Sequence, residues 1–458
     1  MSEKPRTEPA RGMRDFLPDD VRRREYVIGI VKAVYERYGF EPLETPAVEN
    51  IETLMGKYGD EGNQLIYKIL KRGEHEASGQ ADLALRYDLT VPLARVVAHH
   101  QAKLPRLFKR YQIQPVWRAD RPARGRFREF YQCDVDALGS TSPVVEAELC
   151  AAVSDVLHAL GFHDFVIRLN HRKALAGLLE ASGVPVGQHG QALVALDKLD
   201  KIGPDGVAKE LAERGLPEAA RQALLAFDWM ASERERTLDV GVSNANAFAR
   251  MRTFVGSHEE ATSALGNLAE IAALVQTTSA AGHVRIDASL ARGLSYYTGA
   301  IMEINVPDLA GSLGGGGRYD NLVGMFLGQD IPACGFSLGL ERILVVMGER
   351  NMFPSTLATT PADVMIATFD ATRVGDAMRI ASTLRAQGIR VLVYPDADKI
   401  GKQIKYADSR AIPLVALLGD DEIAAGTVTI KNLRAQTQET YDQAAAGAAI
   451  LEVLKHRG

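Results

Sequence analysis

The sequence predicts an α+β protein of several domains, and three observations support this prediction. Residues 104–117 and 126–137 have strand patterns joined by a turn that contains Pro and Gly, as in an antiparallel hairpin. Residues 171–283 are rich in Ala and Leu at helical spacing, broken by Gly. Strand and helix patterns alternate after about residue 360. A chain of 458 residues exceeds one hydrophobic core, so we expect two to four domains.

The N-terminal region begins with a predicted helix over residues 20–38, where apolar side chains recur at helical spacing until Gly39 ends the pattern. Residues 40–46 contain two prolines and read as an extended segment at a sheet edge or an interface. This helix and segment could form core packing or a dimer face. Residues 83–97 then change from a strand pattern to a helical pattern across Asp88-Leu89-Thr90.

The middle of the chain contains a predicted helix over residues 142–160, with Ser142 as its expected cap and Pro143 in its first turn. A strand is expected next at residues 165–170. Strand patterns return at residue 284, after the Ala/Leu-rich block, so we interpret that block as a helical insertion. The strands expected there are 299–306 and 331–337, followed by a helix from about Ser337 that carries Arg342.

The domain limits follow from these changes of pattern. Residues 352–362 have the Pro and Thr content of a linker. Beyond the linker, predicted strands at 362–369, 390–395, 413–419 and 427–433 alternate with helices. The expected segments are a first domain in two parts (1–170 and 284–352), a helical insertion (171–283) and a C-terminal α/β domain (361–458).

The composition excludes several classes of protein. No apolar run approaches the ~20 residues of a membrane span, and the polar N-terminus has no apolar signal core, so we expect neither a membrane protein nor an exported one. The three cysteines form no CxxC pair, which argues for a reducing cytosol and against a disulfide framework or a structural zinc site. The net charge is −5, yet residues 106–128 hold eight Lys or Arg and one acid, which would attract phosphate.

Residues 118–136 are the first of four segments that could carry chemistry. Five arginines surround a Gly, and Gln132, Asp134 and Asp136 follow. Arginines that fork onto phosphate oxygens, next to acids that accept from a cation, suit a site for ATP plus a cationic amino acid. In such a site Arg118 would contact the α-phosphate, Arg126 the terminal phosphates, and Phe130 would stack on the base. The alternative is a solvated basic hairpin.

The second segment is Arg86–Thr90, where an acid and a hydroxyl could hold the amino group of a substrate. The same two residues, Asp88 and Thr90, could instead cap a helix.

The third segment, residues 290–299, places Arg292 where it could stabilise charge on a phosphorus centre. Gly293 allows a tight backbone, and Tyr296 and Tyr297 offer hydroxyls, although a Tyr-Tyr pair in a strand is also common in packing.

The fourth segment joins the glycines 314–317 and Tyr319 to residues 334–343. Four glycines allow a ligand to approach the backbone closely, or form a flexible loop; they are not a P-loop because no Gly-Lys-Ser/Thr follows. Arg342 could face a triphosphate or pair with an acid.

These segments, in this order, resemble the class II aminoacyl-tRNA synthetases and, within them, the histidyl-tRNA synthetase family. The resemblance extends nearly from end to end. Residues 20–46 are similar to motif 1, the dimer-interface motif, residues 117–136 to motif 2, and GFSLGLERI (335–343) to motif 3. RYDLT, LARGLSYYTG and GGGGRYD resemble the histidine-specific branch. The implied fold is an antiparallel sheet flanked by helices, with a helical insertion and a C-terminal α/β anticodon-binding domain.

The resemblance also implies roles for single residues. Arg118 and Arg292 are implied to be catalytic. The residues implied to bind histidine are Asp88, Thr90, Arg118, Gln132, Asp136, Arg292, Tyr296, Tyr297 and Tyr319. The residues implied to bind ATP are Arg118, Asp120, Arg126, Phe130 and Arg342.

The implied activity is the formation of histidyl-adenylate from histidine and ATP, with Mg²⁺ on the outer phosphates, and transfer of histidine to tRNA(His) by a cytoplasmic homodimer. Two departures stand out. Ser295 replaces the Asp usual in the family, and RYDLT resembles the eukaryotic branch rather than the RPEGT form common in bacteria, with the acid retained as Asp88.

Two other classes of protein are alternatives to the enzyme. A catalytically inactive paralogue, which senses histidine as a regulatory subunit of histidine biosynthesis, would lack the C-terminal domain and lose the motif arginines. This chain has the C-terminal domain and keeps the motif arginines. A non-enzymatic RNA-binding module would need neither the glycine-rich segment nor Arg292. The sequence therefore favours the active enzyme.

Overall fold

The computed structural model describes residues 7–73, 78–229, 239–291, 296–355, 357, 360–396 and 398–455. The chain divides into two compact units. One comprises Met1–Phe16 and Arg24–Met352, and the other comprises Leu17–Arg23 and Phe353–Gly458. Among the described residues, no helix is both long enough and apolar enough to cross a membrane.

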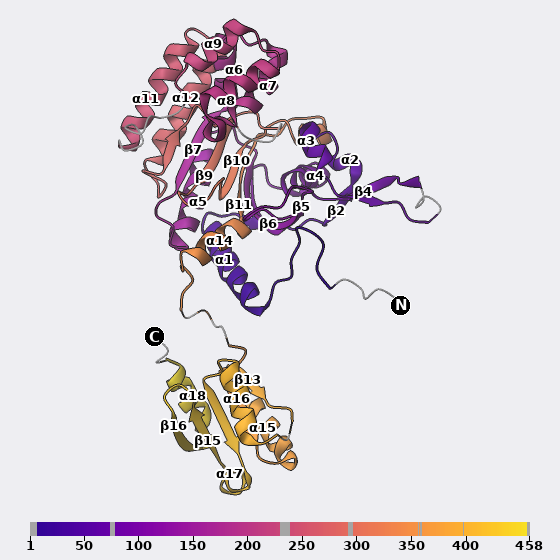
Figure 1. Cartoon of the computed structure of the whole chain (residues 1–458), viewed down its shortest axis with the longest axis vertical. Coiled ribbons are helices and arrows are strands. Elements are labelled where there is room, and N and C mark those ends of the chain that lie inside the picture. Colours follow the sequence, from indigo (N-terminus) through magenta and orange to yellow (C-terminus); the bar gives the residue numbers. More distant parts are fainter. Residues whose placement is uncertain are drawn as a thin grey trace. The chain divides into compact units, whose positions relative to one another are not determined.

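The first unit is built on an eight-stranded sheet with the order β1-β5-β6-β11-β10-β9-β7-β8 (Figure 1). Every neighbouring pair from β5 to β7 is antiparallel, and the two outermost pairs, β1 with β5 and β7 with β8, are parallel. The strands are β1 (Glu41–Pro42), β5 (Phe108–Trp117), β6 (Glu129–Leu138), β7 (Val166–His171), β8 (Val284–Ile286), β9 (Ala300–Asn305), β10 (Gly314–Arg318) and β11 (Ala333–Gly339). The predicted α+β class with an antiparallel sheet is confirmed.

Helices cover this sheet with their apolar faces. In α1 (Pro18–Arg37) the buried side chains Val27, Val31 and Val34 recur at helical spacing, which places one stripe of the helix in the core. The other covering helices are α5 (Val144–Ala159) and α14 (Leu340–Glu349). Arg24 of α1 and Glu341 of α14 form a buried ion pair, so the two helices are joined by charge as well as by packing.

A three-stranded sheet, β2-β4-β3, lies beside the large one in Figure 1. Its strands are β2 (Val48–Asn50), β3 (Lys68–Leu70) and β4 (Ala81–Leu85), and its helices are α2 (Ile51–Leu54), α3 (Gly59–Gln64) and α4 (Thr90–His100). The predicted change from strand to helix across Asp88-Leu89-Thr90 is confirmed, because β4 ends at Leu85 and α4 begins at Thr90.

Helices gather at one end of the large sheet, as the magenta and pink elements of Figure 1 show. They are α6 (Arg172–Ala181), α7 (His189–Leu196), α8 (Leu199–Glu213), α9 (Glu218–Ala226), α11 (Val240–Val255) and α12 (Glu259–Val275). Helix α12 packs closely on α6 at Gly177, where an added Cβ would lie 2.3 Å from the Cβ of Ala261. This part of the chain is helical, as the Ala/Leu-rich pattern predicted.

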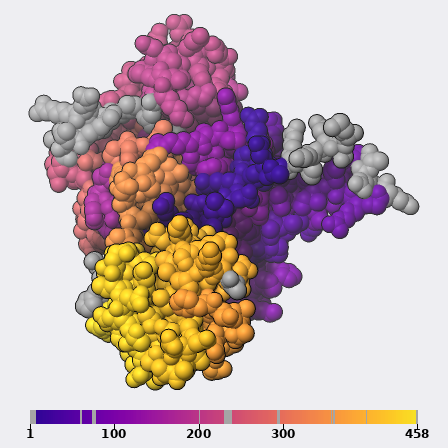
Figure 2. Space-filling model, turned by 60° about the horizontal axis from the view of Figure 1, so that its bottom comes forward, coloured from indigo at the N-terminus to yellow at the C-terminus, as the bar shows by residue number. Residues whose placement is uncertain are grey.

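The second unit contains a five-stranded sheet of order β13-β12-β14-β15-β16, in which the first three strands are parallel. Its strands are β12 (Val364–Thr368), β13 (Val391–Val393), β14 (Leu414–Leu418), β15 (Thr427–Asn432) and β16 (Thr437–Asp442). Its helices are α15 (Val374–Ala386), α16 (Ile400–Ser409), α17 (Asp420–Ala425) and α18 (Ala446–Lys455). Figure 2 shows this unit as one continuous body in orange and yellow. Two small buried clusters form its core.

Two local expectations need correction. The glycines 314–317, for which a flexible loop was one alternative, form β10 in the interior of the sheet, bonded to β9 and β11. Ser142 is not the cap residue of α5, because Pro143 holds that position; the Ser142 hydroxyl accepts a 3.3 Å hydrogen bond from the Val144 N–H instead.

Candidate active site

A cavity of about 300 Å³ opens at the large sheet, between the strand-to-helix turn before α4 and the hairpin of β5 and β6. Strands β9, β10 and β11 and the start of α14 complete its wall. Ten of the thirteen residues singled out from the sequence line this cavity. They are Asp88, Thr90, Arg118, Asp120, Arg126, Phe130, Gln132, Tyr296, Tyr297 and Arg342.

One end of the cavity is built around the carboxylate of Asp88, which is 1% exposed. Its Oδ1 accepts hydrogen bonds from the Tyr58 hydroxyl (3.0 Å) and the Val91 N–H (3.1 Å), and its Oδ2 accepts from the Tyr296 hydroxyl (3.0 Å). Burial raises the pKa of Asp88, while the Val91 N–H bond and the charge of Arg118 oppose that rise. Asp88 therefore caps the first turn of α4 and lines the cavity at the same time, so the two interpretations of this segment are compatible.

Arg118 occupies the region between this carboxylate and the hairpin. Its Nε donates to the Tyr87 carbonyl at 3.0 Å, and its guanidinium lies 4.3 Å from the centroid of the Tyr87 ring and 5.2 Å from that of Phe130. The two aromatic rings and one backbone bond hold the planar fork in place. Among the described residues neither terminal nitrogen of Arg118 has a hydrogen-bond partner, so both could meet an anionic ligand.

The other end of the cavity is cationic and more open. Two backbone hydrogen bonds between Ala123 and Arg126 close the hairpin turn, in which Gly125 has a φ of +67°. The Arg126 Nε lies 3.5 Å from Asp120, and its side chain is 53% exposed. Arg342 reaches this turn from α14, bonds the Ser312 carbonyl, and packs so closely that a Cβ at Gly125 would lie 3.3 Å from its Cγ.

The glycine strand forms part of the cavity wall with its bare backbone. Gly314, Gly315 and Gly316 line the cavity. A Cβ at Gly314 would lie 2.4 Å from the Ser337 carbonyl, and one at Gly316 would lie 2.1 Å from the Gly335 carbonyl. Side chains have little room on this strand, because the backbones of β11 and, at Gly315 and Gly317, of β9 approach closely.

The remaining three predicted residues are not part of the described cavity wall. Asp136 and Tyr319 are buried behind it, where the Tyr319 hydroxyl donates to Asp136 Oδ1 at 2.5 Å. Arg292 lies outside the residues that the structure describes, as does Ser295.

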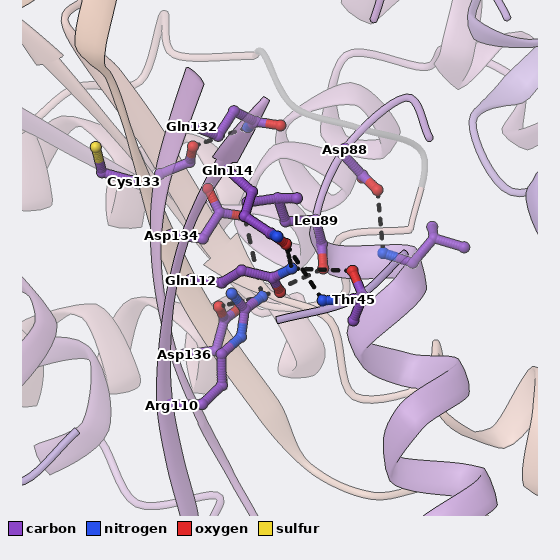
Figure 3. A network of polar contacts seen from close by, with 12 residues as sticks. Thr45, Asp88, Leu89, Arg110, Gln112, Gln114, Gln132, Cys133, Asp134 and Asp136 are labelled. Atoms are coloured by element: carbon purple, nitrogen blue, oxygen red, sulfur yellow. Dashed lines mark hydrogen bonds and ion pairs between the residues drawn. The ribbon is translucent and has the colours of Figure 1, made fainter. Parts of the chain in front are cut away.

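A buried polar network adjoins the cavity (Figure 3), and the sequence interpretation identified its β6 residues but missed those of β5. On β5 the side chains of Arg110, Gln112 and Gln114 alternate with apolar ones and stand opposite Asp136, Asp134 and Gln132 of β6. Gln114 Oε1 accepts from Gln112 Nε2 (2.6 Å) and from the Thr45 N–H (3.2 Å). The signal was present in the sequence as polar residues at every second position of a predicted strand, a pattern normally taken as a solvent-facing side.

The electrostatics of this network centre on two carboxylates. Arg110 is fully buried, and its terminal nitrogen lies 2.8 Å from Asp136 Oδ2 and 4.0 Å from Asp134 Oδ2. Burial raises the pKa of Asp134 to about 7 and also raises that of Asp136, while the charge of Arg110 lowers both. Two carboxylates are thus buried behind the cavity wall, on the same strand face as Gln132, while Arg126 and Arg342 line the open end.

Two families of known proteins match the two structural units of the chain separately. A family model described as histidyl-tRNA synthetase matches residues 12–343, and a model described as an anticodon-binding domain matches residues 363–452. A histidine–tRNA ligase of Cytophaga hutchinsonii is 41% identical, with 94% of this chain and 97% of the relative covered. One from Gloeobacter violaceus is 40% identical, with 96% and 97% covered.

Solved structures are similar as well. The histidyl-tRNA synthetase of Nostoc sp. PCC 7120 superposes with a TM-score of 0.80 and 30% identity, covering 98% of this chain and all of that one. A Bacillus halodurans protein, described as an ATP phosphoribosyltransferase regulatory subunit/histidyl-tRNA synthetase, has a TM-score of 0.69 at 22% identity, covering 90% and 98%. At that identity the likeness concerns the fold alone.

Proposed function

The chain belongs to the histidyl-tRNA synthetase family, and from this premise we propose that it is a ligase that activates histidine with ATP and transfers it to the 3′ end of tRNA(His). The observation that supports this most is the distribution of charge along the cavity. A buried carboxylate with three hydrogen-bond donors stands at one end, Arg118 lies beside it, and Arg126 and Arg342 stand at the other end. Such a cavity suits an amino acid and a triphosphate side by side.

The histidine would lie on the carboxylate side. Asp88 would accept from its ammonium group, with Thr90 and Tyr296 beside it. Gln132 and Tyr297 would face the imidazole, supported from behind by Asp136 and Tyr319. ATP would take the arginine side, where Phe130 would stack on the adenine, Arg126 and Arg342 would hold the phosphates, and Asp120 would act through the magnesium ion of MgATP.

The chemistry would need no side-chain nucleophile. The histidine carboxylate attacks the α-phosphorus, the bond to the β-phosphate oxygen breaks, and pyrophosphate leaves. A hydroxyl of the terminal tRNA ribose then attacks the adenylate carbonyl, and AMP leaves. Arg118 and Arg292 would stabilise the charge that develops on the α-phosphate, so positioning and electrostatics carry the rate.

Magnesium enters this proposal as part of the substrate, MgATP. Among the described residues no cluster of three or more His, Cys, Asp or Glu could hold a metal ion. Mg²⁺ commonly uses phosphate oxygens and one or two carboxylates, so Asp120 in the cavity wall suits that role.

The partners and compartment follow from the family. The C-terminal unit would bind the anticodon, as its family model suggests. We also propose a homodimer formed through α1 and β1, the elements that resemble motif 1. The three cysteines are free and buried, which suits a reducing cytoplasm.

The alternative is the histidine-sensing regulatory paralogue, a class named in the description of the Bacillus halodurans structure. Two observations favour the enzyme. The relatives at about 40% identity are named histidine–tRNA ligases over nearly their full length, and the chain has a unit that matches an anticodon-binding domain.

The deciding experiment is histidine-dependent exchange of labelled pyrophosphate into ATP, with the other amino acids as controls. We expect exchange with histidine alone. Folded protein that binds histidine but gives no exchange would support the regulatory paralogue.

A further inference from the structure

Three cross-strand pairs form a polar ladder on the cavity side of β5 and β6. Arg110 stands opposite Asp136, Gln112 opposite Asp134, and Gln114 opposite Gln132. Because side chains two residues apart share one face of a strand, Asp134 and Asp136 lie on the same face as Gln132, which lines the cavity. Figure 3 shows the ladder rising from Arg110 to Gln132.

Arg110 joins two parts of the pocket. Its terminal nitrogen lies 2.8 Å from Asp136 Oδ2 and donates to the Leu89 carbonyl at 3.3 Å. Leu89 lies between Asp88 and Thr90, the residues proposed to hold the histidine ammonium. One buried guanidinium therefore spans the imidazole side and the ammonium side of the pocket.

The space around Asp136 is fixed by its neighbours. A Cβ at Gly335 would lie 1.8 Å from Asp136 Oδ1, so only glycine leaves room for this carboxylate. The Tyr319 hydroxyl holds the same oxygen from the other side. Asp136 has little freedom to move while Arg110 is in place.

The charges of this cluster do not balance. Two carboxylates share one guanidinium, and among the described residues Arg110 Nε, Arg110 Nη1 and Asp134 Oδ1 have no hydrogen-bond partner. Buried unpaired polar atoms cost stability, so a cluster of them is more readily explained by a role in ligand binding than by a role in folding.

The ionisable groups that face the two carboxylates come from every adjacent element. They are Arg110 of β5, Arg86 and Asp88 before α4, Tyr35 of α1, Cys133 of β6, Tyr297 and Tyr319 beside β9 and β10, and Cys334 of β11. Arg110 is the one cation that affects both carboxylates in this set. Tyr297, which lines the cavity, experiences the charges of both Asp134 and Asp136.

We propose that Arg110 is a positioning residue for the histidine pocket and that Asp134 is its charge-setting residue. Arg110 holds Asp136 and the Leu89 turn in place. When both carboxylates are ionised, the cluster of Arg110, Asp134 and Asp136 behind the cavity wall has a net charge of −1, which favours a ligand ring that carries N–H donors over rings that do not. This inference rests on the proposed function.

The test compares the wild type with Asp134→Asn in pyrophosphate exchange between about pH 5.5 and 9. The substitution keeps the shape of the side chain and removes its charge. Burial raises the pKa of Asp134 to about 7, so the wild-type carboxyl is neutral well below that pH and charged well above it. We expect the variant to raise KM for histidine about tenfold at pH 8.5 and to leave it unchanged near pH 5.5, with KM for ATP within about twofold throughout. The titration of histidine itself cancels in the ratio of variant to wild type.

Arg110→Lys and Arg110→Met test the positioning role. Lysine retains the charge with one donor group, so we expect KM for histidine to rise less with lysine than with methionine. KM for ATP should not change in either variant. Arg95→Lys is the matched control, because Arg95 also holds a buried carboxylate, that of Glu49, through two bonds of 2.8 and 2.7 Å, and neither residue lines the cavity. It should lower thermal stability without a histidine-specific effect.

The outcomes separate the two proposals. If the wild type gives no exchange, the proposed function fails. If the wild type gives exchange but the Asp134→Asn ratio does not change with pH, or both KM values rise equally, the inference is overturned and the cluster is structural.

Discussion

Arg24 and Glu341 lie 317 positions apart in the sequence, yet they form a buried ion pair of 2.8 Å. The second oxygen of Glu341 accepts from the Tyr131 N–H at 2.9 Å, and the Arg24 guanidinium lies over the rings of Phe16 and Tyr131. One carboxylate thus joins α1, α14 and β6. Since Glu341 lines the cavity and α14 carries Arg342, this pair also fixes one wall of the site.

Replacing Glu341 by Gln should therefore destabilise the first unit. The change leaves the Arg24 charge buried without its partner, which costs about 3–5 kcal/mol. Glu260→Gln, at an exposed pair with Lys173, should leave stability unchanged within error. Urea unfolding of both variants measures the difference, and equal stabilities would contradict the role of the pair.

Gly335→Ala should weaken histidine binding more than ATP binding. Its Cβ would meet Asp136 Oδ1 at 1.8 Å and must displace the carboxylate. We expect KM for histidine to rise about tenfold, with a stability loss of about 1–3 kcal/mol. Gly348→Ala is the control, because no atom lies within 4 Å of its added Cβ and alanine favours the helix there. An unchanged KM in Gly335→Ala would show that Asp136 does not support the pocket.

Arg118→Lys should nearly abolish adenylation. Lysine lacks the planar fork that lies against Tyr87 and Phe130, and the loss of one such donor to a developing charge lowers the rate about 10²–10³-fold. Arg121→Lys, an exposed position in the same hairpin that does not line the cavity, should retain activity. Single-turnover formation of adenylate distinguishes the two, and near-normal rates for Arg118→Lys would remove this residue from the mechanism.

Deleting the residues after about 360 should spare pyrophosphate exchange and cripple aminoacylation. The described cavity is lined by residues between Asp88 and Arg342, whereas the anticodon-binding model matches residues 363–452. Both reactions would be measured on the same preparation. Full charging of tRNA by the shortened protein would show that the C-terminal unit is not an anticodon binder.

The stability of the first unit should fall in mild acid because of His171. Its Nδ1 accepts from the Lys173 N–H at the start of α6, and burial lowers its pKa to about 4. The unfolded chain therefore binds a proton at higher pH than the folded one. Neutral His171 contributes about 3 kcal/mol to the free energy of unfolding above pH ~6.5. This contribution is lost as the pH falls towards 4.

The matched variant is His171→Asn, which keeps a capping acceptor and cannot titrate. Its melting temperature should change less between pH 7 and pH 5 than that of the wild type. Parallel pH dependence of the two proteins would assign the acid sensitivity to other groups.

The sequence by itself determined the fold class, the main helices and strands, and the family. Local patterns were sufficient for these, because apolar periodicity in α1 and the Asp88-Leu89-Thr90 transition reflect interactions within a few residues along the chain. Ten of the predicted site residues also came together in one cavity, since the motif residues fall on strand ends and turns that share one side of the sheet. The roles of these residues remain predictions.

Only the tertiary structure decided the rest. Nothing local distinguishes a glycine loop from β10, because the close approach that excludes side chains there comes from β11 and β9. Arg110 and Gln112 are polar residues in a strand, which local patterns assign to solvent. They are buried because distant segments, the turn at Leu89 and the segment at Thr45, pack over that face of the sheet, and such packing is a property of the folded chain.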